Sequence, residues 1–202
     1  NDVIHLEVGQ PSSPAPPKVL EIAKTTLTTD KLGYTDALGT LALRERIAKH
    51  YRDTYKVNVD IKRIFITTGS SGGLLLSFLS SFDVGDYVGL ATPGYPAYKN
   101  MLLALGIKVL EIPVGYKSNF QLTREILDEQ HFEKLDGLII SSPSNPTGSM
   151  ISSSSLHNLV DWCEAREVRL ISDEIYHGIV YGKPASTALR DSNNTIVINS
   201  FS

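Results

Sequence analysis

Short apolar segments rich in β-branched and aromatic residues alternate along this chain with longer segments that have helical patterns. Most intervals between the apolar segments are long enough to carry a helix. This alternation predicts an α/β fold with three αβα layers, in which helices cover both faces of a mostly parallel sheet. The expected strands are Ile4–Val8, Arg63–Thr68, Asp86–Ala91, Lys108–Val114, Gly137–Ile140, Val168–Ile171 and Thr195–Asn199.

Turn and capping residues place the expected helices between these strands. Pro16 and Pro17 suit the first turn of a helix that runs to about Thr28. Thr40, Thr123 and the serine run Ser152–Ser155 are typical of helix N-caps. The expected helices are 16–28, 41–55, 74–82, 98–105, one that Thr123 opens, and one from the serine run to about Glu167.

The composition limits the domain count and the partners. The 202 residues, 42% of them hydrophobic, suffice for one large domain, with residues 1–30 as an N-terminal segment and 31–202 as the main domain. The net charge of −3 with mixed signs favours neither nucleic acid nor an anionic membrane as partner. The single cysteine, Cys163, indicates a reducing compartment, the cytoplasm. The five histidines have no metal-ligand spacing, so no metal site is expected.

Polar side chains follow several expected strands, at the edge where open α/β sheets bind ligands. Asp173 and Tyr176 come directly after the buried segment Val168–Ile171. For a single aspartate, a solvated loop after a core strand would be the better explanation, so the interpretation depends on the other strand ends. Gly69, Ser70 and Ser71 precede an apolar helix, so free N–H groups and the helix dipole can bind a phosphate.

The Gly/Ser loop restricts the kind of phosphate ligand. It lacks the Gly-Lys-Ser/Thr of a nucleotide-triphosphate loop, and a tight turn would also explain its composition. A serine hydrolase that uses Ser70 or Ser71 is disfavoured, because neither lies in a Gly-x-Ser-x-Gly elbow.

Two further loops carry an aromatic ring and an amide. Tyr95 lies between Gly94 and Pro96 and can stack on a flat ligand, or pack under its own loop. Asn145 lies in a proline-stiffened loop, where turn formation alone would also explain it. A phosphate cradle, a stacking ring, an amide, a carboxylate and a phenol at one edge fit pyridoxal 5′-phosphate best, with the carboxylate on the ring nitrogen.

At these motifs the chain resembles the fold type I pyridoxal-phosphate aminotransferases of class I/II, the aspartate aminotransferase superfamily. The resemblance covers the whole chain, and the Asn-Pro-Thr-Gly and Asp-Glu-x-Tyr motifs are its most specific part. It implies a phosphate site at Gly69, Ser70, Ser71 and Ser200; a ring site at Tyr95, Asn145, Asp173 and Tyr176; substrate contacts at Gly9 and Asn145; and Tyr34 reaching the phosphate of a neighbouring subunit in a homodimer.

The same resemblance implies residues beyond this sequence. The family's Schiff-base lysine is expected directly after Ser202, so we interpret the chain as a large cofactor domain without its C-terminal small domain. The implied reaction moves an amino group between an amino acid and a 2-oxo acid. A C–S β-lyase or a decarboxylase would use the same residues, and a non-catalytic sensor domain of a regulator would bind the same cofactor.

Overall fold

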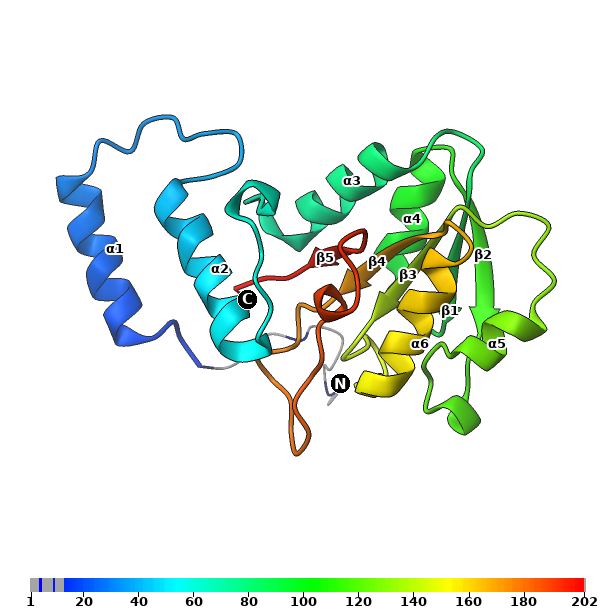
Figure 1. Cartoon of the computed structure of the whole chain (residues 1–202). Coiled ribbons are helices and arrows are strands. Elements are labelled where there is room, and N and C mark those ends of the chain that lie inside the picture. Colours follow the sequence, from blue (N-terminus) through cyan, green and yellow to red (C-terminus); the bar gives the residue numbers. More distant parts are fainter. Residues whose placement is uncertain (1–3, 5–8, 10–12, 202) are drawn as a thin grey trace. The chain divides into compact units, whose positions relative to one another are not determined.

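The computed structural model describes residues 4, 9 and 13–201 (Figure 1). The chain divides into two compact units, Asn1–Asp36 and Ala37–Ser202. In the first unit, α1 (Pro17–Thr29) begins with the expected proline, and none of its described side chains is buried. The expected strand Ile4–Val8 lies outside the described residues except for Ile4, which is not in a strand.

The second unit is built on a sheet of five strands in the order β2-β1-β3-β4-β5 (Figure 1). All four pairings are parallel, which confirms the expected α/β architecture. The carboxyl ends of the five strands therefore lie at one edge of the sheet. The strands are β1 (Tyr87–Thr92), β2 (Lys108–Pro113), β3 (Gly137–Ser141), β4 (Arg169–Asp173) and β5 (Ile196–Ile198).

Helices alternate with the strands along the chain. Two of the three expected N-cap side chains make a capping hydrogen bond. Thr123 Oγ1 accepts from Ile126 N–H at 3.3 Å, and Ser152 Oγ accepts from Ser155 N–H at 3.1 Å. Thr40 is an N-cap residue, but its side chain makes no capping bond within the described part of the chain. The helices are α2 (Leu41–Tyr55), η1 (Ile61–Arg63), α3 (Gly69–Ser81), α4 (Pro96–Ala104), η2 (Tyr116–Ser118), α5 (Arg124–Glu129), α6 (Ser153–Glu164) and η3 (Ala188–Arg190).

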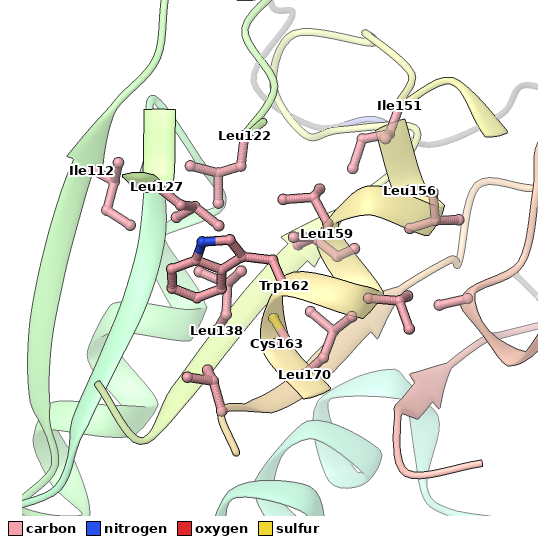
Figure 2. Close-up of a cluster of buried hydrophobic side chains, with 14 of the residues drawn as sticks. Ile112, Leu122, Leu127, Leu138, Ile151, Leu156, Leu159, Trp162, Cys163 and Leu170 are labelled. Atoms are coloured by element: carbon pink, nitrogen blue, oxygen red, sulfur yellow. The ribbon is translucent and has the colours of Figure 1, made fainter. Parts of the chain in front are cut away.

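Alternate residues of the central strands face two separate hydrophobic clusters. Leu138 and Ile140 contribute to the cluster that contains α5 and α6, whereas Ile139 contributes to the cluster that contains α3 and α4. Figure 2 shows the first cluster, with Trp162 of α6 among aliphatic side chains. Because successive strand side chains point to opposite faces, apolar residues at consecutive positions require helices on both. None of the described helices is long and apolar enough to cross a bilayer.

The expected strand Arg63–Thr68 is wrong. Arg63 ends the 3-10 helix η1, and residues 64–67 have no regular secondary structure among the described positions. Ile66 N–H donates instead to the Leu38 backbone oxygen at 3.0 Å. The β-branched composition favours extended backbone, but a strand also needs a hydrogen-bonded neighbour in a sheet.

Gly137 begins β3 at a point where the chain has no room for a side chain. A Cβ there would lie 2.3 Å from Cζ of Phe82. We expect Gly137→Ala to lower the free energy of unfolding by about 1–3 kcal/mol, because the packed ring must move. Gly115→Ala is the matched control, since its Cβ would meet no described atom within 4 Å. Urea denaturation of both variants measures the difference; equal stabilities would contradict the expectation.

Candidate active site

Asp173 is the last residue of β4, and its side chain is only 3% exposed. The sheet places it between the end of β3 at Ser141 and the end of β5 at Ile198. Two donors bind its carboxylate: the Tyr98 hydroxyl donates to Oδ2 at 2.5 Å, and Ile175 N–H donates to Oδ1 at 3.2 Å. The carboxylate is thus fixed at the carboxyl end of a buried strand.

Burial and hydrogen bonding act in opposite directions on Asp173. Burial raises the pKa of the carboxyl group, while the Tyr98 hydroxyl and the Ile175 N–H lower it. Burial, followed by the charge of Asp173, raises the pKa of Tyr98, so this phenol keeps its proton. A hydrogen bond to a carboxylate from a donor that cannot ionise stabilises the negative charge.

Tyr98 is a site residue that the sequence analysis missed. It lies in the first turn of α4, three residues after Tyr95, which is the N-cap of this helix. The two rings pack edge to face, with centroids 5.3 Å apart at 82°. Tyr95 is 36% exposed, so part of its ring can meet a ligand. The spacing in Pro-Gly-Tyr-Pro-x-Tyr was the available signal, but the partner of the second tyrosine is 75 residues away.

Removing the Tyr98 hydroxyl tests its hold on Asp173. We expect Tyr98→Phe to lower the free energy of unfolding by about 1.5–3 kcal/mol, because a hydrogen bond to a buried charge is lost. The pKa of Asp173 should rise further, since the Tyr98 hydroxyl is the largest influence that lowers it. Tyr116→Phe, at a fully exposed position, is the control. Chemical denaturation gives the free energies of unfolding of the two variants. Equal stabilities would argue against the hydrogen bond between Tyr98 and Asp173.

Asn145 and Tyr176 come together from two loops at the same edge. The Asn145 amide donates to the Tyr176 hydroxyl at 3.5 Å, a long hydrogen bond. Gln121 holds the base of the Asn145 loop, because its Nε2 donates to the backbone oxygens of Ser141 at 3.2 Å and of Ser149 at 2.8 Å. Gln121 belongs to no sequence motif, so no local signal marks it as a site residue.

A pocket opens at the carboxyl ends of β1 and β3. Its wall includes Tyr95, Tyr98, Gln121 and Asn145. The Tyr95 loop and the Asn145 loop therefore form walls of the same pocket. Leu90, Ala91, Gly94, Leu122, Ile139, Ile140, Ser141 and Ser144 complete the lining.

The expected phosphate loop forms the first turn of α3. Gly69 begins the helix with φ at +74°, a backbone conformation that favours glycine. The Gly69 N–H donates to the Thr67 backbone oxygen at 2.9 Å. The N-cap residue Thr68 makes no side-chain capping bond among the described residues, so the Ser70 and Ser71 N–H groups are the ones left to bind a ligand. A Cβ on Gly73, in the second turn, would lie 3.5 Å from Cδ1 of Ile198, so α3 packs beside the last residue of β5.

Two of the expected site residues belong to the N-terminal unit. Gly9 and Tyr34 are both exposed there. Their assigned contacts, with the substrate and with a neighbouring subunit, stay predictions. Ser200 follows β5, and its N–H donates to the Asn199 side chain at 2.8 Å.

Comparisons with known proteins agree with this arrangement. A family model described as "Aminotransferase class I and II" matches residues 1–202. A valine–pyruvate aminotransferase of Mycobacterium tuberculosis is 48% identical over 203 residues, which are 100% of this chain and 52% of that protein. A (5-formylfuran-3-yl)methyl phosphate transaminase of Methanocaldococcus jannaschii is 40% identical, over 99% of this chain and 52% of that protein.

Solved structures show the same likeness. A crystal structure of an aminotransferase from Mycobacterium tuberculosis has a TM-score of 0.91 and 47% identity, over 96% of this chain and 53% of that one. An aromatic aminotransferase from Pyrococcus horikoshii has a TM-score of 0.92 at 28% identity, over 99% of this chain and 55% of that one. The chain thus spans about half the length of the relatives that it matches.

Proposed function

Because the chain belongs to the class I and II aminotransferase family, we propose that the protein containing it is a pyridoxal-phosphate-dependent aminotransferase. It would move an amino group between an amino acid and a 2-oxo acid. The observation that carries this proposal is the buried, doubly hydrogen-bonded carboxylate of Asp173 at the shared edge of a parallel sheet. This group suits a cationic ring nitrogen, for which a buried anion is a strong partner.

The other groups at this edge fit the remaining parts of pyridoxal phosphate. The Ser70 and Ser71 N–H groups at the start of α3 suit a phosphate, and Ser200, two residues after the end of β5, would add a hydroxyl. The Asn145 amide and the Tyr176 hydroxyl suit an anionic ring oxygen, since both can donate to it. The half-exposed ring of Tyr95 suits a stacked heteroaromatic ligand.

When bound, the cofactor supplies an electron sink that stabilises negative charge on the substrate Cα. Asp173 would keep the proton on the ring nitrogen, and Tyr98 would keep Asp173 charged and oriented. Asn145 and Tyr176 would fix the rotation of the ring in its plane. These charges and dipoles are in place before the reaction, so little reorganisation accompanies it. A lysine directly after Ser202 would anchor the cofactor and carry the proton at Cα.

The relatives suggest which substrates to assay first. Valine with pyruvate is the first pair, because the relative named for it is 48% identical to this chain. The assay uses full-length protein with added cofactor and measures alanine formed from pyruvate, followed by a panel of other amino acids. We expect amino transfer with at least one donor. Tight cofactor binding without transfer from any donor would contradict the enzymatic proposal and favour a sensor domain.

We also propose that the full-length protein is a cytoplasmic homodimer. The full exposure of Tyr34 supports the dimer, because a side chain that contacts the cofactor of a neighbouring subunit must not be buried in its own subunit. The buried free thiol of Cys163 supports a reducing compartment. Sedimentation of the full-length protein measures the assembly state, and an active monomer would contradict the role of Tyr34.

A further inference from the structure

Glu174, the residue after Asp173, points into the protein interior and is only 1% exposed. One of its oxygens, Oε1, accepts from the Ala188 N–H at 2.8 Å and from the Ser172 hydroxyl at 3.0 Å. The other, Oε2, is buried and has no hydrogen-bond partner among the described residues. A buried carboxylate normally has every lone pair directed at donors, so this bare oxygen needs an explanation.

The side chains around Oε2 provide no positive charge. His177 Nδ1 lies 3.6 Å from Oε2, and it is the one basic group within ion-pair distance of Glu174 in the described part of the chain. This ring nitrogen already bonds the Tyr55 hydroxyl of α2 at 2.9 Å. Burial lowers the pKa of His177 to about 4, with the Ser142 backbone acting against it, so the ring is neutral at physiological pH.

The remaining neighbours are neutral or negative. From α2, Tyr51 and Tyr55 face Glu174, and the carboxyl group contributes to raising the pKa of both phenols. From β4 comes Asp173, whose negative charge opposes a second one beside it. Burial raises the pKa of Glu174 to about 7 and outweighs the Ala188 N–H and the Thr187 and Ser172 hydroxyls, which lower it.

We propose that Glu174 is held as a neutral carboxylic acid with its proton on Oε2, and that it forms an uncharged support with His177 and Tyr55 behind the cofactor-binding turn. A proton on Oε2 removes the unpaired buried charge at a position 3.6 Å from a neutral imidazole that cannot neutralise it. Two adjacent buried acids thereby take different roles: Asp173 carries the only charge, and Glu174 supplies packing and hydrogen bonds.

This support connects the turn that carries Asp173 and Tyr176 to three other elements. Glu174 N–H donates to the Ile198 oxygen of β5 at 2.8 Å, and Oε1 binds the start of η3. His177 joins the turn to Tyr55 of α2. Glu174 is therefore a positioning residue for the proposed cofactor site, and this part of the inference rests on the proposed function.

The protonation state is tested on the full-length protein without cofactor, so the result does not depend on the proposed function. Difference infrared spectra of wild type and Glu174→Gln should contain, at about pH 6, the carbonyl stretch of a protonated carboxylic acid that the variant lacks. Glu129→Gln, at an exposed position, is the control and should remove only a carboxylate band. A carboxylate band lost from Glu174→Gln at about pH 6 would overturn the proposal.

The pH dependence of stability gives a second test. The pKa of Glu174 is 4.5 in the unfolded chain and about 7 in the folded protein. The stability that protonated Glu174 contributes is therefore fully present below the pKa of the unfolded state and is lost as the pH rises through the pKa of the folded state. The melting temperature of Glu174→Gln relative to wild type should therefore increase from about pH 5 to about pH 8. His177 is common to both proteins, so its opposite dependence cancels. A pH-independent difference would contradict a titrating Glu174.

Cofactor affinity tests the positioning role. Glu174→Ala removes both hydrogen bonds to Oε1 and should weaken pyridoxal-phosphate binding roughly tenfold. Glu174→Gln imitates the protonated acid, so it should restore the affinity to within about threefold, well under the loss for an unmade buried hydrogen bond. Equal losses in the two variants would show that the negative charge is needed and would overturn the neutral support. Failure of the wild type to bind would instead refute the proposed function.

Discussion

Replacing Asp173 by Asn in the full-length protein should lower kcat for amino transfer by on the order of 10²–10³-fold. The amide has the shape of the carboxylate but no charge, so it cannot keep a ring nitrogen protonated. The amide keeps one oxygen, which can still accept from the Ile175 N–H, while its NH2 group replaces the oxygen that accepted from the Tyr98 hydroxyl and can donate to that hydroxyl instead. We therefore expect a large loss of turnover with a much smaller loss of cofactor affinity.

The comparison needs a control that changes an aspartate outside the site. Asp161→Asn removes an exposed carboxylate on α6, where it faces His157 at 3.4 Å, and should leave kcat unchanged. Steady-state kinetics and a cofactor titration of both variants separate the loss of chemistry from the loss of binding. Near-normal turnover in Asp173→Asn would refute the role of this residue as the partner of the ring nitrogen.

Replacing Trp162 by Ala should lower the free energy of unfolding by about 3–5 kcal/mol. Trp162 lies in α6 and is almost fully buried in the cluster between this helix, α5 and the sheet (Figure 2). Its truncation leaves a cavity that aliphatic neighbours such as Leu127 and Leu138 cannot fill without moving. The same change removes the indole N–H that donates to Asp128 at 2.7 Å.

Trp162→Phe separates the two contributions. It keeps a buried aromatic ring, although a smaller one, and removes the hydrogen bond to Asp128, whose carboxyl group is on the surface. We expect the phenylalanine variant to lose less than half as much stability as the alanine variant. Guanidinium denaturation followed by circular dichroism measures both. Similar losses would indicate that the hydrogen bond, and not the packing, dominates at this position.

Local sequence patterns were sufficient for most of the sheet. The segments that became β1 to β5 combine β-branched residues with consecutive apolar positions, which only a sheet covered on both faces can bury. The segment Arg63–Thr68 has the same composition but no strand beside it. Composition predicts which segments can be extended, whereas pairing depends on neighbours that are distant in sequence.

The site divides in the same way. Asp173 ends β4 and Asn145 lies in the loop after the adjacent strand β3, so parallel topology alone predicted that they would lie at one edge. The supports behind them could not be predicted locally, because Tyr98 and Asp173 are 75 residues apart, and Tyr55 and His177 are 122 residues apart. Glu174 and Asp173 are both acids in sequence, and only the packing shows that Asp173 has donors on both oxygens whereas Glu174 Oε2 has none among the described residues.

The most direct test of the central claim is the absorption spectrum of full-length protein with pyridoxal phosphate, before and after borohydride reduction. The account predicts a visible band of lysine-bound cofactor, and mass spectrometry after reduction should place the added mass on a lysine directly after Ser202. Absence of such a band with saturating cofactor, or attachment to any of the lysines within residues 1–202, would contradict it.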